Sequence, residues 1–236
     1  MKKAGIITVL TIIIAVFLFV FPHNKIPVSI KRYYMKNKLF GQGGYLRSWI
    51  QSDDPAIIDI ANKLKAEDEQ TSIINAYNWL EKNYHYVPDS DISFSDGRIT
   101  IRENTDYWQK PLLTLSIIQQ TGGFYGDCED GTFLLTSILN AMGYHDIYAE
   151  IGTVSLQSGI YGHAWVVWHK DGRYYLLETT LGTPLQQIRV LPSFYSPQFM
   201  FNDVEIKQFY SGTLRNVPML TPKAREELIE RLNGNN

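Results

Sequence analysis

Residues 55–85 place apolar side chains three and four positions apart, which is the period of amphipathic helices. Asp53 or Asp54 followed by Pro55 is typical of a helix start, because an acidic side chain caps free N–H groups and proline fits the first turn. A second helix is predicted from about Thr71 to about His85. The apolar positions of the two helices are Ile57, Ile58, Ile60, Ala61 and Leu64, then Ile73, Ile74, Ala76, Tyr77 and Leu80.

A third helix is predicted in the stretch GDCEDGTFLLTSILNAMGY, which begins at Gly126. Asp127 suits the N-cap position, which puts Cys128 in the first turn. Gly143 stands where the C′ glycine of a helix belongs. The apolar side of this helix is formed by Leu134, Leu135, Ile138, Leu139 and Met142.

The chain after the third helix alternates as β-strands do, in the runs DIYAEIGTVSL, HAWVVWH and RYYLLETT, with a further strand predicted at 204–209. Asp171-Gly172 predicts a two-residue hairpin turn between the last two runs. That turn sets a register in which His163 and Glu178 lie on one face of the sheet, about 7–8 Å apart at the backbone. A shift of one residue would send Glu178 to the other face.

The first residues differ from the rest of the chain. Residues 4–21 carry no charge, and as a helix they reach about 27 Å, close to the hydrocarbon thickness of a bilayer of about 30 Å. Phe19 to Pro22 offer no small-residue cleavage site, which favours an uncleaved single-pass membrane anchor over a cleaved signal peptide. The Met-Lys-Lys start favours an extracytoplasmic domain, and this is the orientation that we expect for the soluble part. The basic residues of 23–48 favour the opposite orientation, or contact with anionic lipid.

The order of helices and strands predicts an α+β fold. We expect a membrane anchor at 1–22, a basic juxtamembrane linker at 23–54, the main domain at 55–220 and a C-terminal helix or tail at 221–236. Hydrophobic residues make up 44% of the chain and charged residues 19%, as in globular proteins, and 15 Tyr, 11 Phe and 5 Trp favour a core that contains strands. The net charge of −2 gives no electrostatic argument for binding nucleic acid.

Cys128 is the single cysteine, which excludes an internal disulfide and a zinc site with several cysteines. A helix N-terminus favours the thiolate and offers N–H groups to an oxyanion. The neighbouring acids Asp127, Glu129 and Asp130 oppose ionisation, so a nucleophilic cysteine here needs a histidine nearby as proton acceptor and donor. The register of the hairpin makes His163 the candidate, with Glu178 to fix its imidazole.

The pieces GDCEDGTFLLTSILNAMGY, GHAWVVW and YYLLETT resemble, in this order, the transglutaminase-like superfamily with its papain-like core, in its bacterial and archaeal branch related to cysteine peptidases. The resemblance covers about residues 55–182. It implies a catalytic cysteine at the N-terminus of a helix that packs on an antiparallel sheet carrying the histidine and the acid. It also implies Cys128 as nucleophile, His163 as base and acid, and Glu178 as the orienting carboxylate. The family most often has aspartate in place of Glu178.

Together with the predicted anchor, this resemblance implies a membrane-anchored thiol enzyme that cleaves a peptide, isopeptide or other amide bond of a protein or peptide through a Cys128 thioester, or transfers its acyl group. No cofactor or metal is expected. Trp108, Gln109 and Gly162 are candidates for oxyanion or substrate contacts. Two alternatives stay open: a catalytically silent binding module at the membrane, and a metal site built from Asp127, Cys128, Asp130 and His163.

Overall fold

The computed structural model describes residues 43–87, 93–95, 98–100, 108–182, 188–209 and 217–234. The helices are α3 Gly43–Arg47, α4 Pro55–Leu64, α5 Glu69–Asn83, α6 Pro111–Thr121, α7 Cys128–Ala141 and α8 Pro222–Gly234. The strands are β1 Tyr84–Tyr86, β2 Ser93–Ser95, β3 Arg98–Thr100, β4 Phe124–Gly126, β5 Ile147–Leu156, β6 Gly159–Lys170, β7 Arg173–Leu177, β8 Arg189–Val190, β9 Tyr195–Phe201 and β10 Ile206–Gln208.

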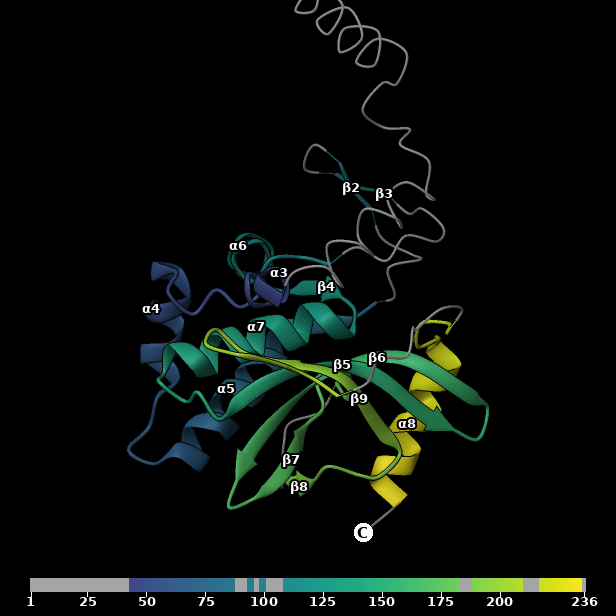
Figure 1. The fold of residues 1–236 in the computed structure, drawn as a ribbon. Helices are drawn as coiled ribbons and strands as arrows, with labels where there is room; N and C mark the ends of the chain where they lie inside the picture. The colour runs from purple at the N-terminus through teal and green to yellow at the C-terminus, as the bar shows by residue number, and fades with distance from the viewer. Residues whose placement is uncertain are drawn as a thin grey trace, which may run out of the picture. The chain divides into compact units, whose positions relative to one another are not determined.

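A six-stranded sheet in the order β10-β9-β5-β6-β7-β8 forms the centre of the fold, and its pairings are antiparallel. Helix α7 lies along one face of the sheet, with α4 and α5 beyond it, and α8 lies at the other face (Figure 1). Alternate residues of β6 therefore point to different cores. Val166 and Trp168 pack with α4, α5 and α7, whereas Trp165 and Val167 pack with α8. The predicted combination of helices with an antiparallel sheet is confirmed.

The hairpin that sets the register is confirmed. Lys170 pairs with Arg173 and Val166 with Leu177, as expected from a two-residue turn. Asp171 and Gly172 have φ angles of 50° and 72°, the left-handed values that this turn requires and that Asp-Gly adopts at low cost. Strand β6 starts at Gly159, earlier than the predicted run, so His163 lies inside the strand.

Helix α7 has the predicted start and end. Its N-cap is Asp127, although the Asp127 side chain makes no capping hydrogen bond, and Gly143 follows with φ 95°. Residues Cys128 to Asn140 are all buried, because other helices cover the side that faces away from the sheet. Helix α5 starts at Glu69, before the predicted Thr71, because the Asp68 carboxylate caps the N–H of Thr71 at 2.8 Å.

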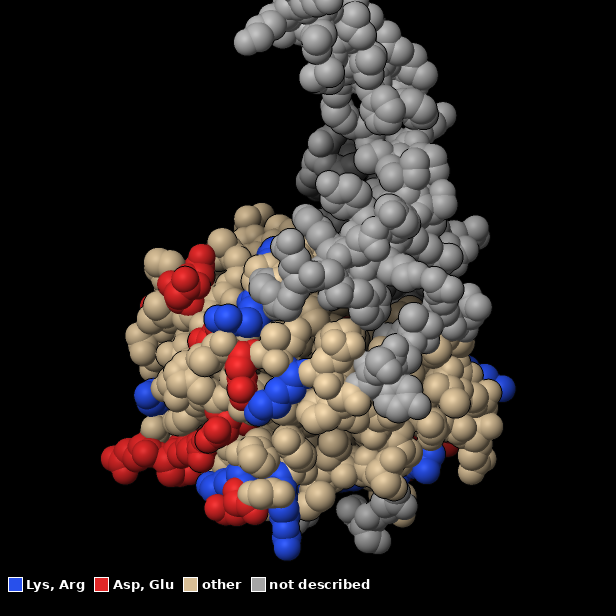
Figure 2. Space-filling view, in the orientation of Figure 1, with Lys and Arg blue, Asp and Glu red and all other residues tan. Residues whose placement is uncertain are grey.

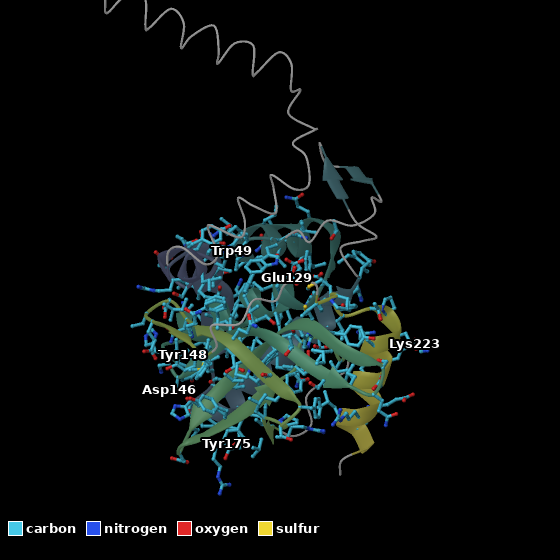
Figure 3. All side chains as sticks on the ribbon, turned by 45° about the vertical axis from the view of Figure 1, so that its right-hand side comes forward. Trp49, Glu129, Asp146, Tyr148, Tyr175 and Lys223 are labelled. Carbon is cyan, nitrogen blue, oxygen red and sulfur yellow. The ribbon has the colours of Figure 1, made fainter. Side chains whose placement is uncertain are left out.

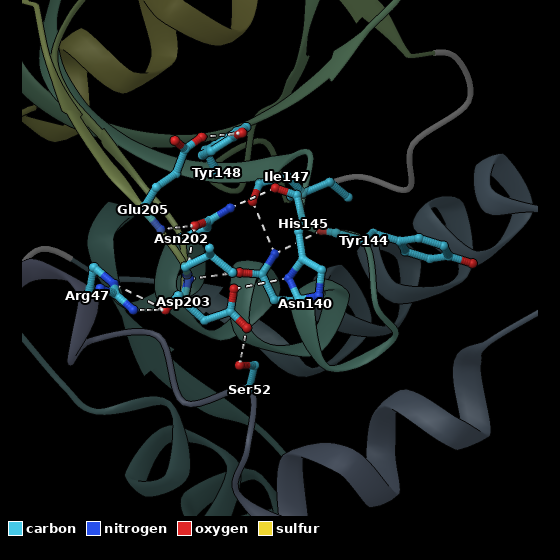
Figure 4. Close-up of polar contacts among 11 residues, drawn as sticks. Arg47, Ser52, Asn140, Tyr144, His145, Ile147, Tyr148, Asn202, Asp203 and Glu205 are labelled. Atoms are coloured by element: carbon cyan, nitrogen blue, oxygen red, sulfur yellow. Dashed lines mark hydrogen bonds and ion pairs between the residues drawn. The ribbon is translucent and has the colours of Figure 1, made fainter.

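Residues 43–54, expected to belong to the linker, are part of the folded structure. Arg47 donates to the backbone oxygen of Asp203, and the Asp203 carboxylate accepts from the Ser52 hydroxyl at 2.6 Å and contacts His145 Nδ1 at 3.2 Å (Figure 4). The Asp203 N–H also donates to Asn140 near the end of α7. The turn between β9 and β10 thus holds the start of the folded part against α7.

The predicted membrane anchor at 1–22 lies outside the residues that the structure describes. Within the described ranges, no helix has the length and apolar character needed to cross a membrane. On the face that Figure 2 shows, basic and acidic side chains of the described residues lie interspersed.

Candidate functional site

Cys128 lies at the first position of α7 and is 1% exposed. Its thiol donates to Glu129 Oε2 at 3.3 Å, and the backbone of Ala164, the residue after His163, hydrogen-bonds its sulfur. Burial and the negative charge of Asp127 raise the pKa of the Cys128 thiol well above its ordinary value. Burial and the Asp127 charge therefore favour the neutral thiol, although the hydrogen bonds with Ala164 and Glu129 lower its pKa.

His163 and Glu178 meet as the register predicts. Nε2 of His163 lies 2.9 Å from Glu178 Oε2, and both side chains are almost fully buried. The same carboxylate accepts from the Tyr195 hydroxyl at 2.6 Å, and its other oxygen accepts from the N–H and hydroxyl of Thr180 at 3.1 and 2.8 Å. Burial raises the pKa of Glu178, but the His163 charge and these hydrogen bonds outweigh it and hold that pKa below its usual value.

The imidazole of His163 has one nitrogen committed and one available. Nδ1 is buried and has no hydrogen-bond partner among the residues that the structure describes. The ring stacks against Trp165, with centroids 5.9 Å apart, and lies 6.2 Å from the ring of Tyr195. The Trp165 indole N–H in turn donates to the buried carboxyl of Glu150. Aromatic rings thus fix the plane of the imidazole, while Glu178 fixes its tautomer.

The first turn of α7 is tied to the segment that carries Glu178. The Thr179 hydroxyl donates to the backbone oxygen of Cys128 at 3.5 Å and contacts the Thr132 hydroxyl at 3.4 Å. A side chain at Gly131 would meet Thr179 Cβ at 3.2 Å, so glycine permits this close approach. The cysteine and the acid, far apart in the sequence, are therefore held by neighbouring backbone segments.

The acidic residues around Cys128 separate into two groups. Ligand atoms of Asp127, Cys128 and Glu129 lie within 4.8 Å of one another, all buried; Figure 3 labels Glu129 at the N-terminal end of α7. Asp130 instead accepts from the backbone N–H of Gln109 at 2.7 Å. The ligands predicted for the alternative metal site included Asp130 and His163, whereas the cluster in the structure contains Glu129 in their place.

The other predicted contact residues have different positions. Gln109 is 2% exposed and anchored by Asp130, close to the start of α7. Trp108 packs with Trp49 and Phe133, at ring-centroid distances of 5.5 and 5.3 Å. Gly162 donates its N–H to the backbone oxygen of Pro218 at 2.8 Å.

Two residues beside the site were not predicted from the sequence. Tyr195 of β9 holds Glu178, and Tyr86 of β1 lies near the nucleophile: after burial, the charges of Cys128, Asp127 and Glu129 raise the pKa of its hydroxyl. Tyr86 is adjacent to the helix start because β1 pairs in parallel with β4, which runs directly into Asp127. No local pattern marks either tyrosine, since long-range strand pairing places both.

Comparison with solved structures gives distant likenesses. LapG of Legionella pneumophila in its calcium-bound form has 18% identity and a TM-score of 0.45, over 86% of this chain and 98% of that chain. Another LapG structure has 18% identity and a TM-score of 0.44, over 85% and 96%. A candidate cysteine protease from Cytophaga hutchinsonii has 16% identity and a TM-score of 0.39, over 75% and 57%. No curated protein matches the sequence.

Comparison with protein families gives a firmer result. The family described as "Transglutaminase-like domain" matches residues 56–190, more than half of the chain. The matched region runs from α4 to β8 and contains Cys128, His163 and Glu178 together with the elements that carry them. The chain therefore belongs to the transglutaminase-like domain family.

Proposed function

We propose that the protein is a thiol enzyme that hydrolyses a peptide or isopeptide bond through a thioester on Cys128. One observation carries the proposal: His163 is bound through Nε2 to the ionised Glu178, while its buried Nδ1 is unpaired within the described part of the chain, at the strand position next to the backbone that contacts the Cys128 sulfur. A histidine held in this way can take a proton from a thiol and return it to a leaving amine.

The reaction follows from these positions. The thiol turns from Glu129 to Nδ1 of His163 and transfers its proton there as the sulfur attacks the substrate carbonyl carbon. The carbonyl oxygen becomes an oxyanion, for which the N–H groups of the first turn of α7 are donors. His163 then protonates the departing amine, and the thioester remains. Water, deprotonated by His163, attacks the thioester and releases the acid and the thiol.

Burial of the thiol, with the charge of Asp127, favours a neutral resting thiol. Because the pKa of Cys128 is raised, the thiolate forms only as His163 takes the proton, so substrate binding and proton transfer are coupled. The imidazolium that results lies against the Glu178 carboxylate, which stabilises it in a buried position. This arrangement protects the thiol from oxidation between turnovers, since the thiolate is the form that reacts.

Replacement of Cys128 by Ala tests the proposal. We expect the variant to fold and to lose turnover of peptide and isopeptide substrates completely. The matched control is Thr136→Ala on the same helix, because the Thr136 hydroxyl is buried without a partner among the described residues and its loss leaves the site intact. Residual turnover by purified Cys128→Ala protein would contradict the proposal. Assays with and without an added amine distinguish hydrolysis from acyl transfer.

Membrane attachment is a separate part of the proposal. Support comes from the uncharged residues 4–21, and we expect the full chain to stay in the membrane fraction after alkaline carbonate extraction. Chain that begins at residue 43 should be released. Protease protection of the domain in intact cells then tests the proposed extracytoplasmic orientation.

A metal site is a second candidate function, favoured by the cluster of Asp127, Cys128 and Glu129. Two carboxylates suit a hard cation and a thiolate suits zinc, but the three groups leave coordination positions to be filled by other ligands. Elemental analysis of the purified protein tests it. One ion per chain that is lost in Glu129→Gln would support a metal site, and the absence of a stoichiometric ion would remove it.

A further inference from the structure

The edge of β6 that leads to the site is not paired with β7 along its whole length. Strand β7 ends at Leu177, opposite Val166, so β6 extends beyond its partner from Trp165 back to Gly159. In a strand, the N–H groups of alternate residues point to the same edge. Ala164, directed to this edge, hydrogen-bonds the Cys128 sulfur. Gly162, the next donor along the edge, hydrogen-bonds the backbone oxygen of Pro218.

Residues 218–220 occupy this edge as an extended peptide would. Met219 forms a parallel bridge with Gly162, and the backbone oxygen of Leu220 accepts from the Tyr86 hydroxyl at 3.3 Å. Carbonyls two residues apart in an extended chain point the same way. The Gly162 N–H can therefore donate to the Pro218 oxygen while the Tyr86 hydroxyl donates to the Leu220 oxygen. Both donors lie beside the site: Gly162 precedes His163, and Tyr86 lies near Cys128.

Gly162 lies directly beside the second backbone. A Cβ atom there would lie 3.2 Å from the sulfur at the flexible end of Met219 and 3.7 Å from the Pro218 oxygen, an ordinary contact distance, so the segment lies close to the strand without requiring glycine. Leu220 is 3% exposed and packs in the core beneath α8, whereas Met219 is 41% exposed. The contacts therefore consist of two backbone carbonyls and one apolar anchor, which is how an extended peptide adds to a strand edge.

We propose that the Gly162 edge of β6 binds the extended backbone of a peptide substrate beside Cys128, and that residues 218–220 hold this position until substrate displaces them. The inference rests on the proposed function and adds a substrate class to it: an unfolded or extended peptide segment with a large apolar residue in the place of Leu220. It also accounts for a nucleophile that is 1% exposed, because the chain's own segment occupies the approach.

The test measures the rate at which iodoacetamide alkylates Cys128, the only thiol, in the full-length protein. Leu220→Ala removes the apolar anchor, so we expect alkylation to be at least about tenfold faster than in the wild type, as local opening becomes more frequent. Leu228→Ala is the matched control, a buried leucine of the same core on α8. The peptide acetyl-Val-Pro-Met-Leu-amide should slow alkylation of Leu220→Ala again, and the same peptide with D-methionine should not.

Equal rates in Leu220→Ala and Leu228→Ala, or an exposed thiol that the peptide leaves unprotected, would overturn the inference. If Leu220→Ala does not fold, Met219→Gly loosens the segment at an exposed side chain and carries the same expectation. Adding His163→Ala to the opened variant separates the two claims. If His163→Ala abolishes the faster alkylation of Leu220→Ala, His163 activates the thiol. If the alkylation rate is unchanged, the proposed function is contradicted. Protection of the thiol by the peptide then still tests whether the Gly162 edge binds an extended backbone.

Discussion

At the scale of single residues, the Glu178 carboxylate is the most constrained group of the site. It is buried and accepts from His163, Tyr195 and Thr180. In Tyr195→Phe we expect a loss of about 1.5–3 kcal/mol of stability, since one hydrogen bond to a charged group disappears. The kcat should fall with KM unchanged, because the carboxylate orients His163 less firmly. Chemical denaturation and steady-state kinetics measure the two effects.

Tyr148→Phe is the control for Tyr195→Phe. The Tyr148 hydroxyl also donates to a glutamate, Glu205, at 2.8 Å, but away from the site (Figure 3). Its loss should leave kcat unchanged. Equal effects of the two substitutions would mean that Tyr195 has only a structural role.

The length of the Glu178 side chain gives a second prediction at this scale. The family most often has aspartate here, yet the hydrogen bonds of this site are made to the longer side chain. Glu178→Asp should therefore lower kcat by about 100-fold, as expected when a catalytic group is displaced by about 1 Å. Steady-state kinetics at several pH values measure this, and an activity close to wild type would show that the backbone after β7 adjusts to the shorter acid.

At the scale of elements, the pairing of β5 with β9 requires a glycine at position 152. The pairing of β5 with β9 shifts register between Ile151 and Gly152, and a Cβ at Gly152 would lie 2.1 Å from the Ser196 oxygen and 2.9 Å from the Trp165 ring. Gly152→Ala should therefore cost more than about 3 kcal/mol of unfolding free energy, because backbone must move to make room. A Cβ at Gly143 would meet open space, but this residue has φ 95°. Gly143→Ala should therefore cost only about 1–2 kcal/mol of unfolding free energy. Urea denaturation compares them, and equal losses would contradict this account.

At the scale of the whole molecule, buried acids make stability depend on pH. Burial raises the pKa of Glu150 to about 7 from an ordinary value of 4.5, although the hydrogen bond from Trp165 opposes it. Between these values the folded protein keeps a proton that the unfolded chain has released, so stability falls as pH rises through this range. Glu150→Gln should remove that fall, and its advantage over wild type should grow to the order of 3 kcal/mol by pH 7 and then stay constant.

Thermal unfolding from pH 4.5 to pH 8 measures this dependence. The control is Glu226→Gln, at an exposed position of α8, which should track the wild type at every pH. Glu81 should add to the fall in stability with rising pH, because burial and the charge of Glu178 raise its pKa to about 8. An advantage of Glu150→Gln that is the same at every pH would mean that Glu150 is ionised throughout.

The parts of the fold that could be predicted depend on neighbours in the sequence. Asp171-Gly172 determines the β6–β7 register, and so the meeting of His163 with Glu178, because a two-residue turn leaves one way to pair the strands. Tyr86, Tyr195 and Pro218 could not be predicted beside the site, since parallel pairing of β1 with β4, the β5–β9 pairing and the path into α8 bring them there. The direction of the Cys128 pKa also depends on burial, which the sequence pattern does not determine.

The most direct test of the central claim is to detect an acyl group on Cys128. The full-length protein is mixed with an activated acyl ester, quenched in acid after increasing times, and weighed by mass spectrometry. The account predicts one acyl group per chain that maps to Cys128, forms and disappears during turnover, and forms much more slowly in His163→Ala. Absence of the adduct, or an adduct that forms equally fast without His163, would contradict the assignment of a nucleophile activated by the His163–Glu178 pair.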